Sequence, residues 1–206
     1  MKKFATLVMG LTAVFALTAC GGKGQEVKSE DLQKKAAEIE DHEYSEATIK
    51  YSYSIDSTGM GESEKDSEKA TVKYTFNKEK KEWTTDNTEA KYAEMFEDLL
   101  YMNLKAMAAA GELDISGEAM AQFEQYGKAE AHYYTNPFGL EAKATFNYDE
   151  EGTVMKGSVN AYYAFDKYGF CTKVESKTDI TMKMSIAGYN IEGQSKVDMS
   201  ATVSYK

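Results

Sequence analysis

The side chains best suited to nucleophilic or metal chemistry in this sequence are two cysteines, Cys20 and Cys171, and two histidines, His42 and His132. Their surroundings argue against catalysis. His42 is not followed by the second histidine of a zinc-protease helix, and a lone histidine such as His132 is typical of a surface or a filled core. Cys171 has no activating base beside it and falls on the polar register of its expected strand.

Other motifs that carry chemistry are missing from the sequence as well. It contains no G-x-S-x-G nucleophile motif and no glycine loop of the phosphate-binding type. The acidic stretch 56–69 lacks the ligand spacing of a calcium loop, which favours a solvated charged loop or the end of a hairpin. We therefore expect no enzymatic activity, no cofactor and no metal site.

The first 19 residues have the layout of a secretory signal. Lys2 and Lys3 give a short cationic start. The uncharged apolar run Phe4–Leu17 is too short for a membrane-spanning helix of about 20 residues. The thiol of Cys20 follows directly, at the point where such a leader is cut.

Residues 17–20, Leu-Thr-Ala-Cys, resemble the lipobox of bacterial lipoproteins. The resemblance implies cleavage between Ala19 and Cys20 and a diacylglycerol, with acyl chains such as palmitate, on the Cys20 sulfur. Two acyl chains hold a protein stably on a membrane. The alternative is an ordinary secretory leader with a coincidental cysteine. The lipobox interpretation predicts an exported protein, lipid-anchored at the outer face of the cell membrane, and the Cys-Gly-Gly start is similar to that of Gram-positive lipoproteins.

Residues 20–28 are expected to form a flexible lipidated tether and residues 29–206 a single domain, because no Pro/Gly/Ser-rich linker follows residue 28. A Cys20–Cys171 disulfide would close little from the end of such an arm. The formal net charge is −10, and all of the basic residues are lysine. Such a surface repels nucleic acid and anionic headgroups, so we expect no nucleic-acid partner.

Hydrophobic periodicity divides the rest of the chain into helices and strands. Helical spacing of apolar residues predicts helices, and alternation predicts strands. The expected helices span residues 29–41, 86–110 with Gly111 as the stop, and 116–127; the expected strands span residues 47–56, 70–76, a short segment around Trp83, 140–148, 159–165, 170–186 and 191–205.

This order predicts an α+β fold: a strongly curved antiparallel sheet of about eight strands, a half-barrel, with helices on its concave face. The order, together with the Phe-Asp-Lys-Tyr-Gly-Phe turn at residues 165–170, resembles the LolA/LolB-like and LppX/LprG-like lipoprotein carriers. The resemblance implies a sheet whose concave face holds lipid or acyl chains beneath helices. The sequence has no arginine, so the arginine-dependent release of the outer-membrane carrier is not implied.

Eleven methionines and 15 tyrosines give the chain an excess of adaptable apolar groups. Methionine thioethers adapt to irregular apolar ligands, which favours a ligand cavity. The alternative to a cavity is a filled, methionine-rich core. We expect a lipid or another apolar ligand between helices and sheet, and a structural or interaction lipoprotein with a filled core is the alternative. The residues expected to line the ligand site are Met95, Phe96, Leu99, Met102, Met107, Tyr74, Phe76, Phe146, Met182 and Met184.

Overall fold

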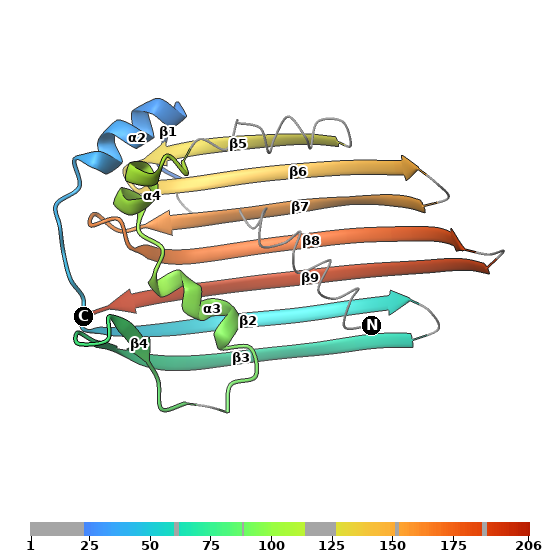
Figure 1. Ribbon diagram of the computed structural model, residues 1–206, viewed down its shortest axis with the longest axis horizontal. Coiled ribbons are helices and arrows are strands. Elements are labelled where there is room, and N and C mark those ends of the chain that lie inside the picture. Colours follow the sequence, from blue (N-terminus) through green and yellow to red (C-terminus); the bar gives the residue numbers. More distant parts are fainter. Residues whose placement is uncertain (1–22, 60–61, 88, 114–126, 151–152, 187–188) are drawn as a thin grey trace.

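The computed structural model describes residues 23–59, 62–87, 89–113, 127–150, 153–186 and 189–206. This part of the chain forms one nine-stranded antiparallel sheet that does not close on itself, accompanied by short helices (Figure 1). In chain order the elements are β1 (Gln25–Val27), α2 (Ser29–Ala37), β2 (Glu46–Gly59), β3 (Glu62–Asn77), β4 (Glu82–Thr84), α3 (Glu94–Glu97), the 3-10 turn η1 (Asp98–Leu100), α4 (Leu104–Ala110), β5 (Gly127–Thr135), β6 (Phe138–Glu150), β7 (Thr153–Phe165), β8 (Cys171–Ile186) and β9 (Tyr189–Tyr205).

The strand order across the sheet is β1-β5-β6-β7-β8-β9-β2-β3-β4. Strands β5 to β9 form a meander in which each strand pairs with the next along the chain. The last strand, β9, then pairs with β2 from Ala47↔Tyr205 to Gly59↔Gly193. The β2–β3–β4 part of the sheet is thus joined to the meander by the pairing of β2 with β9, the last strand of the chain. The two three-residue strands, β1 and β4, lie at the edges of the sheet.

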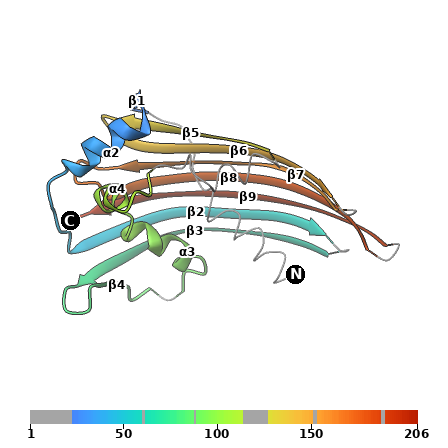
Figure 2. The same cartoon turned by 45° about the horizontal axis from the view of Figure 1, so that its top comes forward.

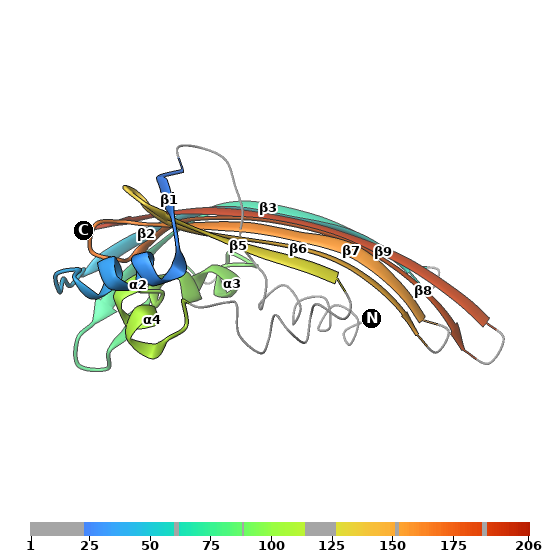
Figure 3. The same cartoon turned by 90° about the horizontal axis from the view of Figure 1, so that it is seen from above.

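Strict alternation gives the sheet two different faces. Ile49, Tyr51, Leu140 and Val203 point to the face that packs with Leu104 of α4 in the main core. Figure 3 shows α2, α3 and α4 together on one side of the sheet. We call this side the helix face and the opposite, mostly polar side the outer face.

Helix α2 binds to the sheet through the stripe that its sequence predicts. Leu32 and Ala36 are fully buried, and Ile39, just beyond the helix, is buried as well. The helix ends at Ala37, earlier than the expected residue 41, and its N-cap is Lys28, which makes no side-chain hydrogen bond to the helix.

The prediction of one helix over residues 86–110 is wrong. The segment is divided into α3, η1 and α4, and Asn103 is extended. Its neighbours bond to the β7–β8 turn: the Leu104 amide donates to the Gly169 carbonyl at 2.7 Å, and the Cys171 amide donates to the Met102 carbonyl at 3.2 Å. These tertiary hydrogen bonds interrupt the helix despite its favourable apolar spacing. Gly111 is the stop that the sequence predicts, with φ at 75°.

Helix α4 begins at a side-chain cap, Asn103, and removal of this cap is expected to lower the stability of the fold. The Asn103 side chain accepts hydrogen bonds from the amides of Lys105 and Ala106. We expect Asn103→Ala to lower the free energy of unfolding by about 1 kcal/mol, measured by urea denaturation. Asn103→Ser retains a capping oxygen and is expected to stay within about 0.5 kcal/mol of the parent. An equal loss in both variants would contradict the capping role.

Of the two forms expected for the acidic stretch from Asp56 to Lys69, the structure has the hairpin end and not the charged loop. Strands β2 and β3 continue through it as a long hairpin, with Asp56 opposite Lys65 and Gly59 opposite Glu62. Lys65 forms an ion pair with Asp56 across the two strands at 2.7 Å, and such opposite-charge pairs stabilise a hairpin. The other expected strands are confirmed, in a sheet of nine strands where about eight were expected. The expected helix over 116–127 lies outside the described residues except for Gly127, which is the first residue of β5.

Candidate functional site

The ten residues expected to line an apolar ligand site do not come together. Tyr74, Phe96 and Leu99 lie in the main core, with Phe76, Met102 and Met107 packed against it. Met95 is 38% exposed and points away from the core. The remaining three, Phe146 of β6 and Met182 and Met184 of β8, do not belong to the main core, and Phe146 lies in a separate cluster.

The space between α3 and the sheet is occupied by stacked rings. The Phe96 ring stacks on Tyr51 with centroids 4.5 Å apart, and the Tyr92 ring lies 4.1 Å from Tyr53. This packing fills the place where the sequence predicts a ligand cavity between helix and sheet. An open groove of about 540 Å³ lies instead between α2 and α4, lined by Gln33 and Ala108 among others.

Two carboxylates of β3 hold the segment that leads into α3. Tyr51 donates to Glu68 at 2.5 Å, and the backbone amides of Lys91 and Tyr92 donate to the same carboxylate at 3.1 Å each. Tyr92 also donates through its hydroxyl to Asp66 at 2.8 Å, and Lys91 pairs with that carboxylate. The hydrogen bond from Tyr51 lowers the pKa of Glu68, and that from Lys91 lowers the pKa of Asp66. The helical cover is therefore fastened to one edge of the sheet by charge-assisted hydrogen bonds.

A second apolar group lies on the helix face, farther along the strands than the described helices. Phe146 packs with Val159, Ile180 and Met155 in a cluster separate from the main core. Met155 is directly opposite Met182 in the β7–β8 register. In Figure 1, α2, α3 and α4 lie toward the other ends of these strands. The apolar stripe thus continues past the helices that the structure describes.

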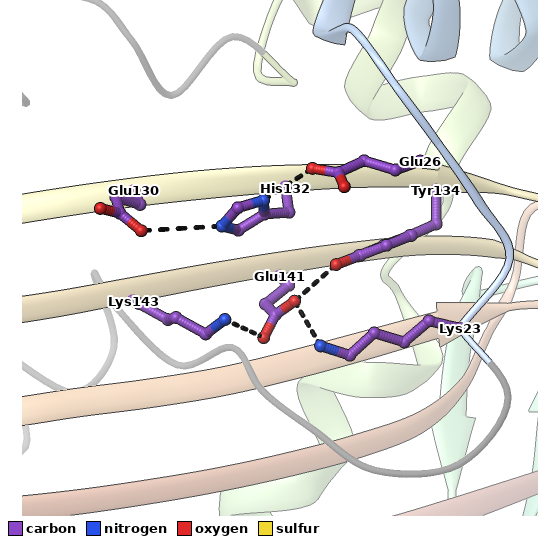
Figure 4. A network of polar contacts seen from close by, with 7 residues as sticks. All are labelled: Lys23, Glu26, Glu130, His132, Tyr134, Glu141 and Lys143. Carbon is purple, nitrogen blue, oxygen red and sulfur yellow. Dashed lines mark hydrogen bonds and ion pairs between the residues drawn. The ribbon is translucent and has the colours of Figure 1, made fainter.

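The most connected polar cluster lies on the outer face, around Glu141 of β6 (Figure 4). Glu141 is adjacent to the core residues Leu140 and Ala142, so its side chain points away from the helices. Its carboxylate accepts from Lys23 at 2.5 Å and from the Tyr134 hydroxyl at 2.6 Å, and Lys143 pairs with it at 2.9 Å.

The Glu141 side chain is only 1% exposed, which makes its charge costly without partners. Burial opposes ionisation, but the hydrogen bonds from Lys23, Tyr134 and Lys143 outweigh it and lower the pKa of Glu141 to about 2. Burial and the bond to Glu141 raise the pKa of Tyr134. The network therefore holds a carboxylate that stays charged throughout the physiological range.

The N-terminal segment is part of this cluster, so the prediction of a flexible tether reaching residue 28 is wrong from Lys23 onward. Strand β1 pairs with β5 from Gln25↔Thr135 to Val27↔Tyr133. At Gly24 an added Cβ would lie 2.2 Å from the Thr135 carbonyl oxygen, so only glycine fits this close approach. The chain is fixed to the sheet about three residues after Cys20.

His132 borders the same cluster. Its Nδ1 lies 2.7 Å from Glu26 of β1, and its Nε2 lies 3.8 Å from Glu130 (Figure 4). The histidine thus links the edge strand to β5 and has no nucleophile among these neighbours. The sequence did not predict the polar cluster formed by Lys23, Tyr134, Glu141 and Lys143. In the sequence, Glu141 is indistinguishable from an ordinary solvent-facing polar residue of an alternating strand.

Cys171 is buried, which corrects its expected place on the polar register. Its side chain is fully buried, and its thiol donates to the Lys173 carbonyl at 3.5 Å. Burial raises the pKa of Cys171 to about 12. A thiol in this state is a poor nucleophile at neutral pH.

Within the described ranges, no group of three or more His, Cys, Asp or Glu side chains is arranged to hold a metal ion. No helix in this part of the chain has the length and apolar character to span a membrane. No protein-family model matches the chain, and neither a curated protein nor a solved structure matches it.

Proposed function

We propose that this chain is an exported lipoprotein, anchored to a membrane through diacylglyceryl-Cys20, that binds or carries a lipid or another apolar ligand. The ligand would lie on the helix face of a half-barrel sheet, with the helices on the concave side. The open nine-stranded sheet and the bend of its strands in Figures 2 and 3 support this architecture.

One observation carries the proposal: the apolar helix face extends beyond the described helices. Met155 and Met184 are partly exposed there, beside the buried Met182 and Ile180. Methionine side chains adapt to irregular apolar partners such as acyl chains. Ligand contact is therefore assigned to Met182, Met184 and Phe146 of the expected set, together with Met155, and not to Met95.

A second candidate, a structural or interaction lipoprotein with a filled core, is favoured by the packing under the helices. Leu32 and Leu104 are fully buried, and Phe96 stacks on Tyr51. The two candidates differ in what they predict for the methionine end of the sheet, which is where the test is placed.

The test is binding of a fluorescent fatty acid to the purified chain, with mass spectrometry of lipids extracted from it. We expect saturable binding that becomes at least about tenfold weaker in Met155→Asp/Met184→Asp, because a charge at each position opposes burial of an acyl chain. Both methionines are partly exposed, so the variant should fold, which circular dichroism checks.

The control is Met95→Asp, the same type of substitution at an exposed methionine of α3. It is expected to leave probe binding unchanged. Absence of any copurified lipid together with absence of saturable probe binding would reject the carrier and leave the filled-core candidate.

A further inference from the structure

A shallow groove of about 280 Å³ lies on the outer face, across β3, β2, β9 and β8. Three lysines line it, Lys50, Lys69 and Lys173, against a single carboxylate, Glu175. Lys50 and Lys69 are exposed, and Lys173 is partly exposed and pairs with Glu175 at 3.0 Å. The groove is thus locally basic in a chain whose net charge is −10.

Hydroxyl groups complete the lining. Ser52, Ser200 and Thr202 are neighbours in the β2–β9 register and face the same side as the lysines. Lysine ammonium groups combined with hydroxyl donors are suited to phosphate oxygens. The groove therefore has the chemistry to receive phosphate-bearing headgroups.

The groove and the Glu141 network lie on one row of the sheet. Successive strand registers pair Glu141 with Tyr162, Tyr162 with Glu175, Glu175 with Ser200, Ser200 with Ser52 and Ser52 with Lys69. With strands about 4.8 Å apart, this row spans about 24 Å from β6 to β3. The site that fixes the N-terminal segment and the basic groove thus share one surface.

The chain between the anchor and this surface is short. Only two residues, Gly21 and Gly22, lie between Cys20 and Lys23, so the three steps from one to the other cover at most about 11 Å when the chain is fully extended. Lys23 pairs with Glu141 on the outer face. We propose that the outer face lies against the membrane and that the lysine groove receives the phosphates of anionic lipid headgroups. This orientation rests on the proposed acylation of Cys20.

The negative charge of the whole chain does not oppose this contact, although composition alone predicts repulsion from anionic headgroups. Exposed charges farther away than a Debye length, about 8 Å at physiological salt, are largely screened. In this orientation the lysines of the groove would lie at the membrane surface. Acids such as Glu30, Asp31 and Glu94 belong to helices on the opposite face of the sheet. Local charge therefore decides the interaction.

The test uses the acylated chain in vesicles and measures lysine acetylation by mass spectrometry. In vesicles of phosphatidylcholine with phosphatidylglycerol, we expect Lys50, Lys69 and Lys173 to react at least about fivefold more slowly than in phosphatidylcholine alone. Lys34 of α2 and Lys78, both outside the groove, are expected to react equally in the two. Equal rates for the groove lysines in the two vesicles would overturn the proposal.

A charge-matched pair of variants tests the groove itself. Lys50→Gln/Lys69→Gln/Lys173→Gln is expected to remove the protection of Lys73, another exposed outer-face lysine, whereas Lys34→Gln/Lys78→Gln/Lys80→Gln is expected to retain it. Loss of protection in both variants would indicate a general charge effect and overturn the groove. Protection by inorganic phosphate in the neutral vesicles would identify a soluble anion as the ligand and overturn the headgroup assignment.

The mass of the intact chain separates this proposal from the proposed function. A chain that carries no diacylglycerol and stays outside the vesicles would overturn the anchor, and the orientation with it. An acylated, vesicle-bound chain with unprotected lysines would overturn the orientation alone.

Discussion

Cys20→Ser is expected to abolish membrane anchoring. The proposed modification attaches the lipid through a thioether, which a serine hydroxyl cannot form, and the cut before residue 20 depends on that lipid. The protein should then remain as an uncut precursor or be released into the medium. Fractionation of producing cells and the mass of the purified chain measure both outcomes.

The matched control is Cys171→Ser, which removes the other cysteine of the chain. Cys171 is buried and its thiol donates only to a backbone carbonyl, so this change should leave acylation and membrane retention as in the parent. Unchanged retention of the Cys20→Ser chain would exclude the lipobox assignment.

Glu141→Ala is expected to lower the free energy of unfolding by about 3 kcal/mol at pH 7. The change leaves the buried Tyr134 hydroxyl without its acceptor and removes the partner of Lys23 and Lys143. It also removes the ion pair that holds Lys23 to the outer face, while the β1–β5 pairing remains, and urea denaturation measures the loss. Glu130→Ala, on the neighbouring strand and 67% exposed, is the control and should cost less than about 0.5 kcal/mol.

The stability contributed by Glu141 should depend on pH in a defined window. The folded protein lowers the pKa of this carboxyl from 4.5 to about 2, so the folded state binds fewer protons than the unfolded state between these values. The contribution is therefore fully present above pH 4.5 and is lost as the pH falls toward 2. The difference between parent and Glu141→Ala should shrink over this range. A difference that stays constant down to pH 2 would show that Glu141 does not act through its charge.

The sequence predicts most of the sheet, because alternation over ten or more residues can be satisfied only by a strand with one buried face. Ile49, Tyr51 and Val203 are all buried as their alternation requires. The prediction of one helix over residues 86–110 is wrong because contacts distant in the sequence override the local pattern. The helical spacing of these residues is real, but hydrogen bonds from residues 102–104 to the β7–β8 turn depend on contacts about 65 residues away in the chain, as in the bond from Asn103 to Tyr168.

The polar network on the outer face could not be predicted from sequence for a similar reason. Lys23 and Glu141 are 118 positions apart, and nothing local marks Glu141 as buried. Its partners are determined by where the first strand of the sheet lies. The prediction of the ligand residues failed in part because one helix was assumed to present five of the ten, whereas α3 turns Met95 outward and buries Phe96.

The charged hairpin formed by β2 and β3 has a consequence for self-association. Strand β4 pairs only with Thr75–Asn77 of β3, so the rest of that long strand forms one border of the sheet among the described residues. An unpaired border of this kind can recruit a strand from another molecule. Along Glu62–Lys69 every second side chain is acidic and the others are serine or lysine, and this density of charge makes flat, dry stacking on a neighbour unfavourable. Molecules at high local concentration would thereby be kept from joining into fibrils.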